Sequence, residues 1–139
     1  MKGKILDSDC CPETGWTYVV KNTKYGTFTA ESYCAAEDME YFNEWDGYRL
    51  CEYKCDLQAL KEKIKWLRQR YIGMDQMLSH TPLSEATKDA YDLAWSLYCQ
   101  IQKEQNLYDR LKDNYPIYAE NLIKQRIDFR KQYCHDNQE

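Results

Sequence analysis

The chain has 139 residues, 19 of them basic and 23 acidic, so its formal net charge at pH 7 is -4. This length suits one domain or a small module on a helical body, and the acidic balance argues against a main task of coating phosphate backbones. With 43% hydrophobic and 30% charged residues, the composition is neither that of a disordered tail nor that of a membrane protein. The acidic excess favours a basic partner instead.

The cysteines and the N-terminus indicate where the protein works. Residues 1–11 contain no apolar run of the kind that a secretory signal needs, and no 18-residue stretch is free of charge. The sequence therefore predicts neither export nor a membrane span. In a reducing compartment thiols persist, and their usual structural use is to hold a metal. Seven cysteines, an odd number, also argue against a framework of disulfides.

Composition changes sharply near Asp56. Residues 1–56 hold five of the seven cysteines and have 6 basic and 11 acidic residues, whereas residues 57–139 have 13 basic and 12 acidic ones. We expect an α+β protein in which residues 1–56 form a β-hairpin module and residues 57–139 form a helical body. The boundary falls inside a predicted helix, so the two parts should be rigidly joined.

The module is predicted to contain a β-hairpin. Apolar and polar residues alternate over 16–21 and again over 27–34, and the residues between them, 22–26, have turn chemistry. With a period of two, Cys34 lies on the same face of the second strand as Phe28. The Cys34 thiol is therefore expected to point inward.

A long helix is predicted from about Gly47, with Asp46 as its N-cap. Its apolar positions are spaced three and four residues apart, which is the pattern of a helix that packs along one face. We call this row of positions the seam. Its members are Leu50, Tyr53, Leu57, Leu60, Ile64, Leu67, Tyr71, Met74 and Leu78.

A second helix is predicted to begin at Pro82 and to pair antiparallel with the first. Its seam runs through Leu83, Ala86, Ala90, Leu93, Leu97, Ile101, Glu104, Tyr108, Leu111 and Tyr115. Pro116 is expected to end or kink this helix, and a third over 117–134 would present Ala119, Ile123, Ile127, Arg130 and Cys134. That third helix, or another protein, would cover a second apolar face of helix two, formed by Tyr91, Trp95 and Tyr98.

Cys51 and Cys55 form the clearest candidate site. They lie one turn apart on the first helix, about 150° from its seam, on a stripe that continues with Gln58 and Glu62. Two thiols on a polar face are explained if the hairpin docks there and adds further ligands. The alternative is that they are ordinary buried cysteines.

Structural zinc prefers four sulfur or nitrogen ligands. The segment from Cys11 to Gly15 resembles the turn of a zinc knuckle, with Thr14 where the second cysteine would stand. The predicted ligands are therefore Cys11, Cys34, Cys51 and Cys55, with Cys10 as the substitute for Cys11. Four thiolates would fill the coordination sphere, so the zinc is expected to be structural and not catalytic.

The motifs of common enzymes are missing from the sequence, and with two distant histidines an enzyme is not expected. The segment between the hairpin and the first helix is the best candidate for partner binding, because aromatic anchors and acids suit a basic groove. The alternative is that its aromatic residues pack on the module beneath a solvated rim. The candidate residues are Glu37, Asp38, Glu40, Tyr41, Phe42, Glu44 and Trp45.

Basic residues on the first helix leave a second possibility open. Lys61, Lys65 and Arg68 share one face and could touch RNA or an acidic protein. Such charged flanks are usually solvated, and direct binding of nucleic acid is not expected. Whether the seam pairs within one chain or between two copies stays open, so a homodimer is possible.

The stretches 26–34 and 47–55 and the acidic segment between them resemble small phage-borne reading frames of low-GC bacteria. With its size, acidity and cysteines, the chain is similar to zinc-containing type II-A anti-CRISPR proteins. The resemblance implies a non-enzymatic inhibitor in the bacterial cytoplasm. It would bind Cas9 or the Cas9–guide RNA complex and block the loading or cutting of target DNA. The alternative is a phage DNA- or RNA-binding regulator stapled by zinc.

Overall fold

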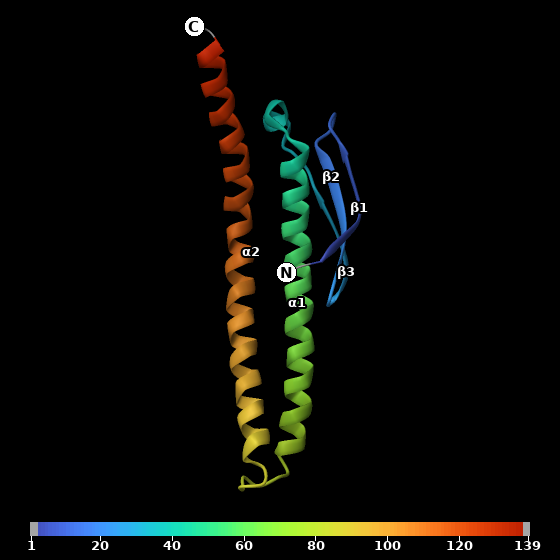
Figure 1. Ribbon diagram of the computed structural model, residues 1–139, viewed down its shortest axis with the longest axis vertical. Coiled ribbons are helices and arrows are strands. Elements are labelled where there is room, and N and C mark those ends of the chain that lie inside the picture. The colour runs from blue at the N-terminus through green and yellow to red at the C-terminus, as the bar shows by residue number, and fades with distance from the viewer. Residues whose placement is uncertain (1–2, 138–139) are drawn as a thin grey trace.

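A computed structural model describes the backbone of residues 3–137 and the side chains of residues 3–133. Three strands come first, β1 (Lys4–Cys11), β2 (Trp16–Thr23) and β3 (Gly26–Ser32), followed by a 3-10 helix, η1 (Ala36–Tyr41). Two long helices complete the chain, α1 (Glu44–Leu78) and α2 (Lys88–Asn137). Figure 1 shows α1 in the middle of an elongated molecule, with the sheet on one side and α2 on the other. The predicted α+β class is confirmed.

The sheet is antiparallel in the order β1-β2-β3. The predicted hairpin is present as β2 and β3, in a register that pairs Thr17 with Ser32 and Thr23 with Gly26. The additional strand β1 was not predicted. A bulge between Ile5 and Asp7 breaks its alternation, and six of its eight residues are exposed, so it has no burial pattern to detect.

Helix α1 begins three residues before the predicted start. Asn43 is its N-cap, and the Asn43 side chain accepts a hydrogen bond from the backbone N–H of Trp45 at 2.9 Å. The prediction that Asp46 caps the helix is wrong, because Asp46 lies inside the first turn with a buried carboxylate. That carboxylate accepts hydrogen bonds from Arg126 of α2 at 2.9 and 3.2 Å. Asp46 therefore forms an ion pair between the two helices and does not cap α1.

Helix α2 begins at Lys88, six residues after the predicted start at Pro82. The segment in between is a loop whose backbone is held by Thr87, which accepts from the N–H of Ser84 at 2.9 Å and donates to the carbonyl of Pro82 at 2.9 Å. Leu83 consequently lies outside the seam and is 70% exposed. The hydroxyl of Tyr91 donates to the carbonyls of Leu78 and Thr81 and so ties α2 to the end of α1.

Pro116 lies inside α2, and the helix continues through it to Asn137, so the separate third helix is wrong. A proline deprives the carbonyl four residues earlier of its helical donor. Here both Pro116 and Lys112 are exposed, so water can reach that carbonyl. Tyr53 of α1 holds both sides of the proline, because its ring lies 5.5 Å from that of Tyr115 and 5.0 Å from that of Tyr118.

Without a third helix folded back, the second apolar face of α2 is covered only in part: Tyr91 and Tyr98 contact α1, whereas Trp95 stays open. Within the described residues Trp95 is 67% exposed and Tyr98 is 38% exposed, and their rings stack on each other. The expectation that a third helix covers this face is therefore wrong.

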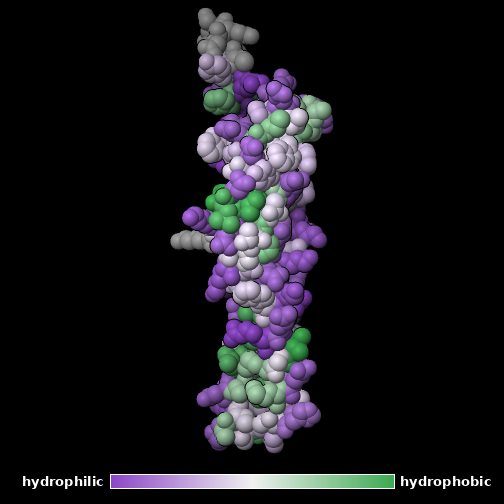
Figure 2. Space-filling model, turned by 90° about the vertical axis from the view of Figure 1, so that its right-hand side faces the viewer, coloured by the Kyte–Doolittle hydropathy of each residue, from purple (hydrophilic) through white to green (hydrophobic). Residues whose placement is uncertain are grey.

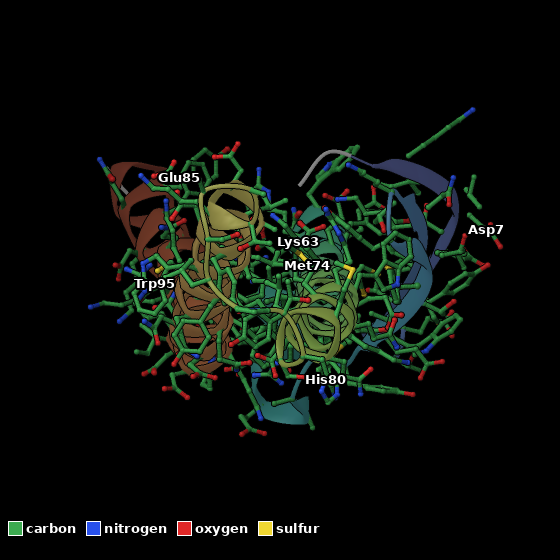
Figure 3. The ribbon with its side chains drawn as sticks, turned by 90° about the horizontal axis from the view of Figure 1, so that it is seen from below. Asp7, Lys63, Met74, His80, Glu85 and Trp95 are labelled. Carbon is green, nitrogen blue, oxygen red and sulfur yellow. The ribbon has the colours of Figure 1, made fainter. Side chains whose placement is uncertain are left out.

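The predicted seam between the helices is confirmed in its central part, where Leu60, Ile64, Leu67, Leu97 and Ile101 are buried. Glu104, the polar member of the seam, forms an ion pair with Lys63 at 2.9 Å. Figure 3 shows Lys63 and Met74 in the space between α1 and α2. Leu93, in contrast, is 57% exposed and lies outside the contact. In residues 3–137 no helix is both long and apolar enough to cross a membrane.

Candidate metal centre and interaction surface

The sheet docks on the stripe of α1 that carries Cys51 and Cys55. Both cysteines are completely buried and form a cluster with Val19 of β2 and Ala30 of β3. Gly47, one turn earlier, permits the close approach, since a Cβ at this position would stand 3.1 Å from the Cβ of Thr17. The inference that the hairpin covers the face opposite the seam is thus confirmed.

Each of the two thiols contacts backbone carbonyls of the sheet. The Cys51 Sγ lies 3.3 Å from the carbonyl oxygen of Thr17 and 3.5 Å from the hydroxyl of Ser32. The Cys55 Sγ lies 3.5 Å from the carbonyl oxygen of Phe28 and 3.8 Å from that of Val19. The three contacts with carbonyl oxygens require a protonated thiol as donor. Burial raises the pKa of Cys51, and burial next to Cys51 raises the pKa of Cys55 to about 11.

The other predicted ligands point to different places. Cys11 pairs with Trp16 on the outer side of the sheet, and a hydrogen bond with Thr14 lowers its pKa. Cys10 pairs with Thr17 on the inner side, where the hydroxyl of Thr17 donates to its Sγ at 3.7 Å. Cys10, the substitute, therefore shares a face with Cys51, whereas Cys11 does not.

Cys34 follows β3 and lies beside Gly15, where a glycine is needed because the φ angle is +75° and a Cβ would stand 2.6 Å from that of Cys34. Its thiol lines a cavity of about 540 Å³ between η1, α1 and α2, whose wall includes Asp46, Leu122 and Ile123. Partial burial, together with the nearby acids of η1, raises the pKa of this thiol. Cys34 thus lines the cavity between η1, α1 and α2, and it does not form a metal-binding group with other described cysteines.

A metal does not fit this arrangement of side chains. Across the part of the chain with described side chains, no three His, Cys, Asp or Glu residues lie together as a metal ion would require. The four predicted ligands are divided between the outer side of the sheet, its inner side and the cavity beside α2. Cys134 lies outside the described side chains, and Cys99 is exposed on α2. The zinc site stays a prediction, and Cys51 and Cys55 have an alternative role as packing and hydrogen-bonding groups.

The acidic segment at residues 37–45 is divided in the structure between exposed and packed residues. The acids Glu37, Glu40 and Glu44 are exposed, as is Trp45 at 62%. Tyr41 and Phe42 are half-buried, and Arg130 of α2 lies over the ring of Tyr41, 5.3 Å from its centroid. The segment is therefore fixed against α2 by its aromatic residues while its acids face solvent.

The outer side of the sheet carries a second group of acids and aromatic residues, which the sequence did not predict. Acids and aromatic rings alternate across the strands here because Asp9 of β1, Tyr18 of β2 and Glu31 of β3 stand in one row. Figure 2 looks onto this side and shows hydrophilic and intermediate colours around a hydrophobic patch in its upper half, with further hydrophobic residues near the lower end of the molecule. The alternation of apolar and polar residues in β2 and β3 could have predicted which of their side chains face outward. Without the strand β1, however, the sequence did not show that these residues and the acids of β1 form one surface. The members are Asp7, Asp9, Trp16, Tyr18, Glu31 and Tyr33.

The predicted basic face also has a definite place. Lys61, Lys65 and Arg68 line a groove of about 620 Å³ that extends from Phe28 of β3 to Tyr108 of α2. The guanidinium of Arg68 donates to the side chain of Gln105 at 3.0 Å. Lys61 and Lys65 are exposed and line this groove.

Comparison with family models, with curated proteins and with solved structures finds no match for this chain. The residues that resemble anti-CRISPR proteins therefore have no matched relative against which they can be checked. What the chain does has to be inferred from its own surfaces.

Proposed function

We propose that the protein acts by binding a basic surface of a nucleic-acid-handling enzyme, specifically Cas9 or its complex with guide RNA, and that it thereby prevents the use of target DNA. The observation that carries the proposal is the distribution of charge. Carboxylates gather at the end of the molecule that holds the sheet, on the outer side of the sheet and on the segment 37–45.

Within the described part of the chain, these carboxylates have no ion pair that a basic partner would have to break, and those of Asp7 and Glu31 accept hydrogen bonds from Tyr18 at 2.6 Å and Tyr33 at 3.1 Å. Among the described residues, the ion pairs that acids form involve Asp46, Glu52, Asp56 and Glu104 only. The acids of the outer sheet face and those at residues 37, 40 and 44 are exposed and have no ion pair within this set. An unpaired carboxylate at a rim raises the rate of association with a basic surface and helps to select it.

The sheet is also rigidly held, which favours recognition by a preformed surface. Cys51 and Cys55 of α1 pack against Val19 of β2, and all three side chains are completely buried. The segment 37–45 is held just before its start, where the N–H of Cys34 donates to the carbonyl of Gly15, and in its middle, where Arg130 of α2 lies over the ring of Tyr41. Binding to a rigid surface costs little ordering entropy.

Capture of the purified protein by immobilised Cas9, with and without guide RNA, tests the proposal. We expect capture that weakens as the salt concentration rises. Reversing two charges near the sheet, with Glu37→Lys and Glu40→Lys, should reduce capture. The matched control is Glu85→Lys with Asp89→Lys, at the opposite end of the helical hairpin, where Figure 1 shows the connection between α1 and α2. No capture at low salt would refute the proposal.

A second candidate function, a regulator that binds DNA or RNA, is favoured by the groove that Lys61, Lys65 and Arg68 line. Basic side chains along a groove could follow a phosphate backbone. A gel-shift assay with duplex DNA and with single-stranded RNA distinguishes the two functions. A shift that disappears steeply with salt, and that Lys61→Glu with Lys65→Glu abolishes, would support the regulator.

A further inference from the structure

The sheet has two edge strands, and α1 protects only one of them. On β3, the carbonyl oxygen of Thr29 accepts a hydrogen bond from the side chain of Gln58 at 3.2 Å. The carbonyl oxygen of Glu31 accepts one from Lys54 at 2.7 Å. Two side chains of α1 thus occupy the backbone groups that a further strand would need, which is how folded proteins close a sheet edge.

The edge of β1 is open by comparison. Within residues 3–137 no strand pairs with it on the side away from β2. The backbone N–H of Cys10 lies on that edge and donates to the carboxylate of its own neighbour Asp9 at 2.8 Å, an exposed contact within β1 that an added strand would replace. Backbone groups alternate in direction along an antiparallel strand, so Ser8 presents its N–H and C=O to the same edge.

The side chains of β1 leave that edge accessible. Ser8 pairs with Val19 and Cys10 pairs with Thr17, and both β2 partners are completely buried, so these two side chains face α1. Asp7 and Asp9 project from the other face of the strand and are exposed. Figure 3 shows Asp7 on the outer side of the sheet, pointing away from α1. The edge is therefore flanked by carboxylates on one face only.

These charges decide which kind of strand fits. Asp7 and Asp9 have no ion pair among the described residues. A strand added to β1 would place every second side chain beside them, where lysine or arginine is favourable and an acid is unfavourable. A second copy of β1 would bring the same two acids against each other, which disfavours self-pairing through this edge.

From this asymmetry we infer that the edge of β1, over residues 7–11, accepts an extended lysine- or arginine-rich segment of a partner protein as a fourth strand. Main-chain hydrogen bonds to Ser8 and Cys10 hold the segment, and Asp7 and Asp9 select its basic side chains. The inference rests on the proposed function, because it names the chemistry by which a basic partner is bound. It also adds a contact surface distinct from the segment 37–45.

Titration with a synthetic ten-residue peptide of alternating lysine and threonine tests the inference, with amide chemical shifts as the readout. We expect the largest shifts at Ser8 and Cys10. Ser8→Pro removes one N–H from the open edge, and proline is tolerated at such positions, so binding should weaken about tenfold or more. Thr29→Pro is the matched control, because its N–H faces the edge of β3, and it should bind like the wild type.

Equal binding by Ser8→Pro and the wild type, or shifts located away from β1, would overturn the inference. Should Ser8→Pro fail to fold, Asp7→Lys with Asp9→Lys decides. That double variant should lose the lysine peptide and bind the matching glutamate peptide, and unchanged preference would overturn the inference.

Repeating the Cas9 capture with Ser8→Pro separates the two proposals. If Cas9 captures the variant as well as the wild type, the open edge is not its contact and the inference fails while the proposed function stands. If Cas9 captures neither protein but the lysine peptide still requires Ser8, the proposed function fails and the inference stands.

Discussion

Helix α1 has two packed sides that use different residues. Toward the sheet, the completely buried side chains are small, namely Thr17, Val19, Cys51 and Cys55, and a glycine brings the backbones close. Toward α2, the buried residues are Leu67, Leu97 and Ile101, with Tyr71 and Met74 packed against them. The same helix therefore makes a close, partly polar contact on one side and a contact between larger apolar side chains on the other.

This difference predicts how substitutions in each contact should affect the stability of the protein. A contact between small side chains and carbonyls has little room to adjust, so substitutions that add volume should destabilise it most. A contact between large apolar side chains depends on buried area, so substitutions that remove volume should destabilise it most. The predictions below test this contrast from the largest expected effect to the smallest.

Leu97→Ala should lower the free energy of unfolding by about 3 kcal/mol, because it removes a buried side chain and leaves a cavity between the helices. Leu97 is 6% exposed, whereas Leu93, one turn earlier, is 57% exposed. Leu93→Ala is therefore the matched control and should change the stability by less than about 0.5 kcal/mol. Urea denaturation followed by circular dichroism measures both. Equal losses in the two variants would contradict the assigned contact.

Gly47→Ala should destabilise the protein by about 2 kcal/mol, because its new Cβ would overlap Thr17 of β2. Gly73→Ala is the matched control in the same helix, since nothing lies within 4 Å of its Cβ. It should stabilise the protein by about 0.5–1 kcal/mol through helix propensity. A mild effect of Gly47→Ala in the same denaturation experiment would show that the sheet is not packed closely on α1.

Arg126→Met should cost about 1 kcal/mol, because it removes the hydrogen bonds to the buried carboxylate of Asp46 and keeps the volume of the side chain. The effect is limited because the Arg126 side chain is 38% exposed and Arg49 lies 3.6 Å from the same carboxylate. Lys124→Met, on an exposed neighbouring position, is the control. Thermal unfolding measures the stability of both variants. Equal stability of the two variants would show that the ion pair does not stabilise the fold.

The last expected effect appears only in alkaline solution. The pKa of Cys55 is raised from 9.0 to about 11, chiefly by burial, so folding favours its protonated form. The corresponding stabilisation is complete below pH 9 and is lost as the pH rises through about 11. Cys55→Ala should therefore lose less stability than the wild type over this range in pH-dependent urea titrations. Parallel losses in both proteins would mean that the thiol is not shielded from water.

The sequence predicted those elements whose burial has a regular period. The seam of α1 and the hairpin of β2 and β3 follow from spacings of three or four and of two. The docking of the sheet on Cys51 and Cys55 could also be predicted, since two thiols stand about 150° from the seam. In each case a residue pattern corresponds directly to a buried face.

The remaining features depend on contacts between distant residues. Strand β1 is exposed along most of its length and is fixed by pairing with β2, so its own residues show no period. Pro116 stays helical because Tyr53, more than sixty positions earlier, packs against both sides of it. The directions of the Cys10 and Cys11 side chains depend on the register of β1, and a count of cysteines cannot reveal that register.

The attachment of the sheet to α1 by small side chains and thiol-to-carbonyl contacts is tested most directly by elemental analysis of freshly purified, reduced protein, with thermal unfolding before and after a chelator is added. Direct attachment predicts a folded protein without stoichiometric zinc, whose midpoint of unfolding the chelator leaves unchanged. One zinc ion per chain, with a midpoint that falls when the ion is removed, would contradict this account and support the ligand set predicted from the sequence.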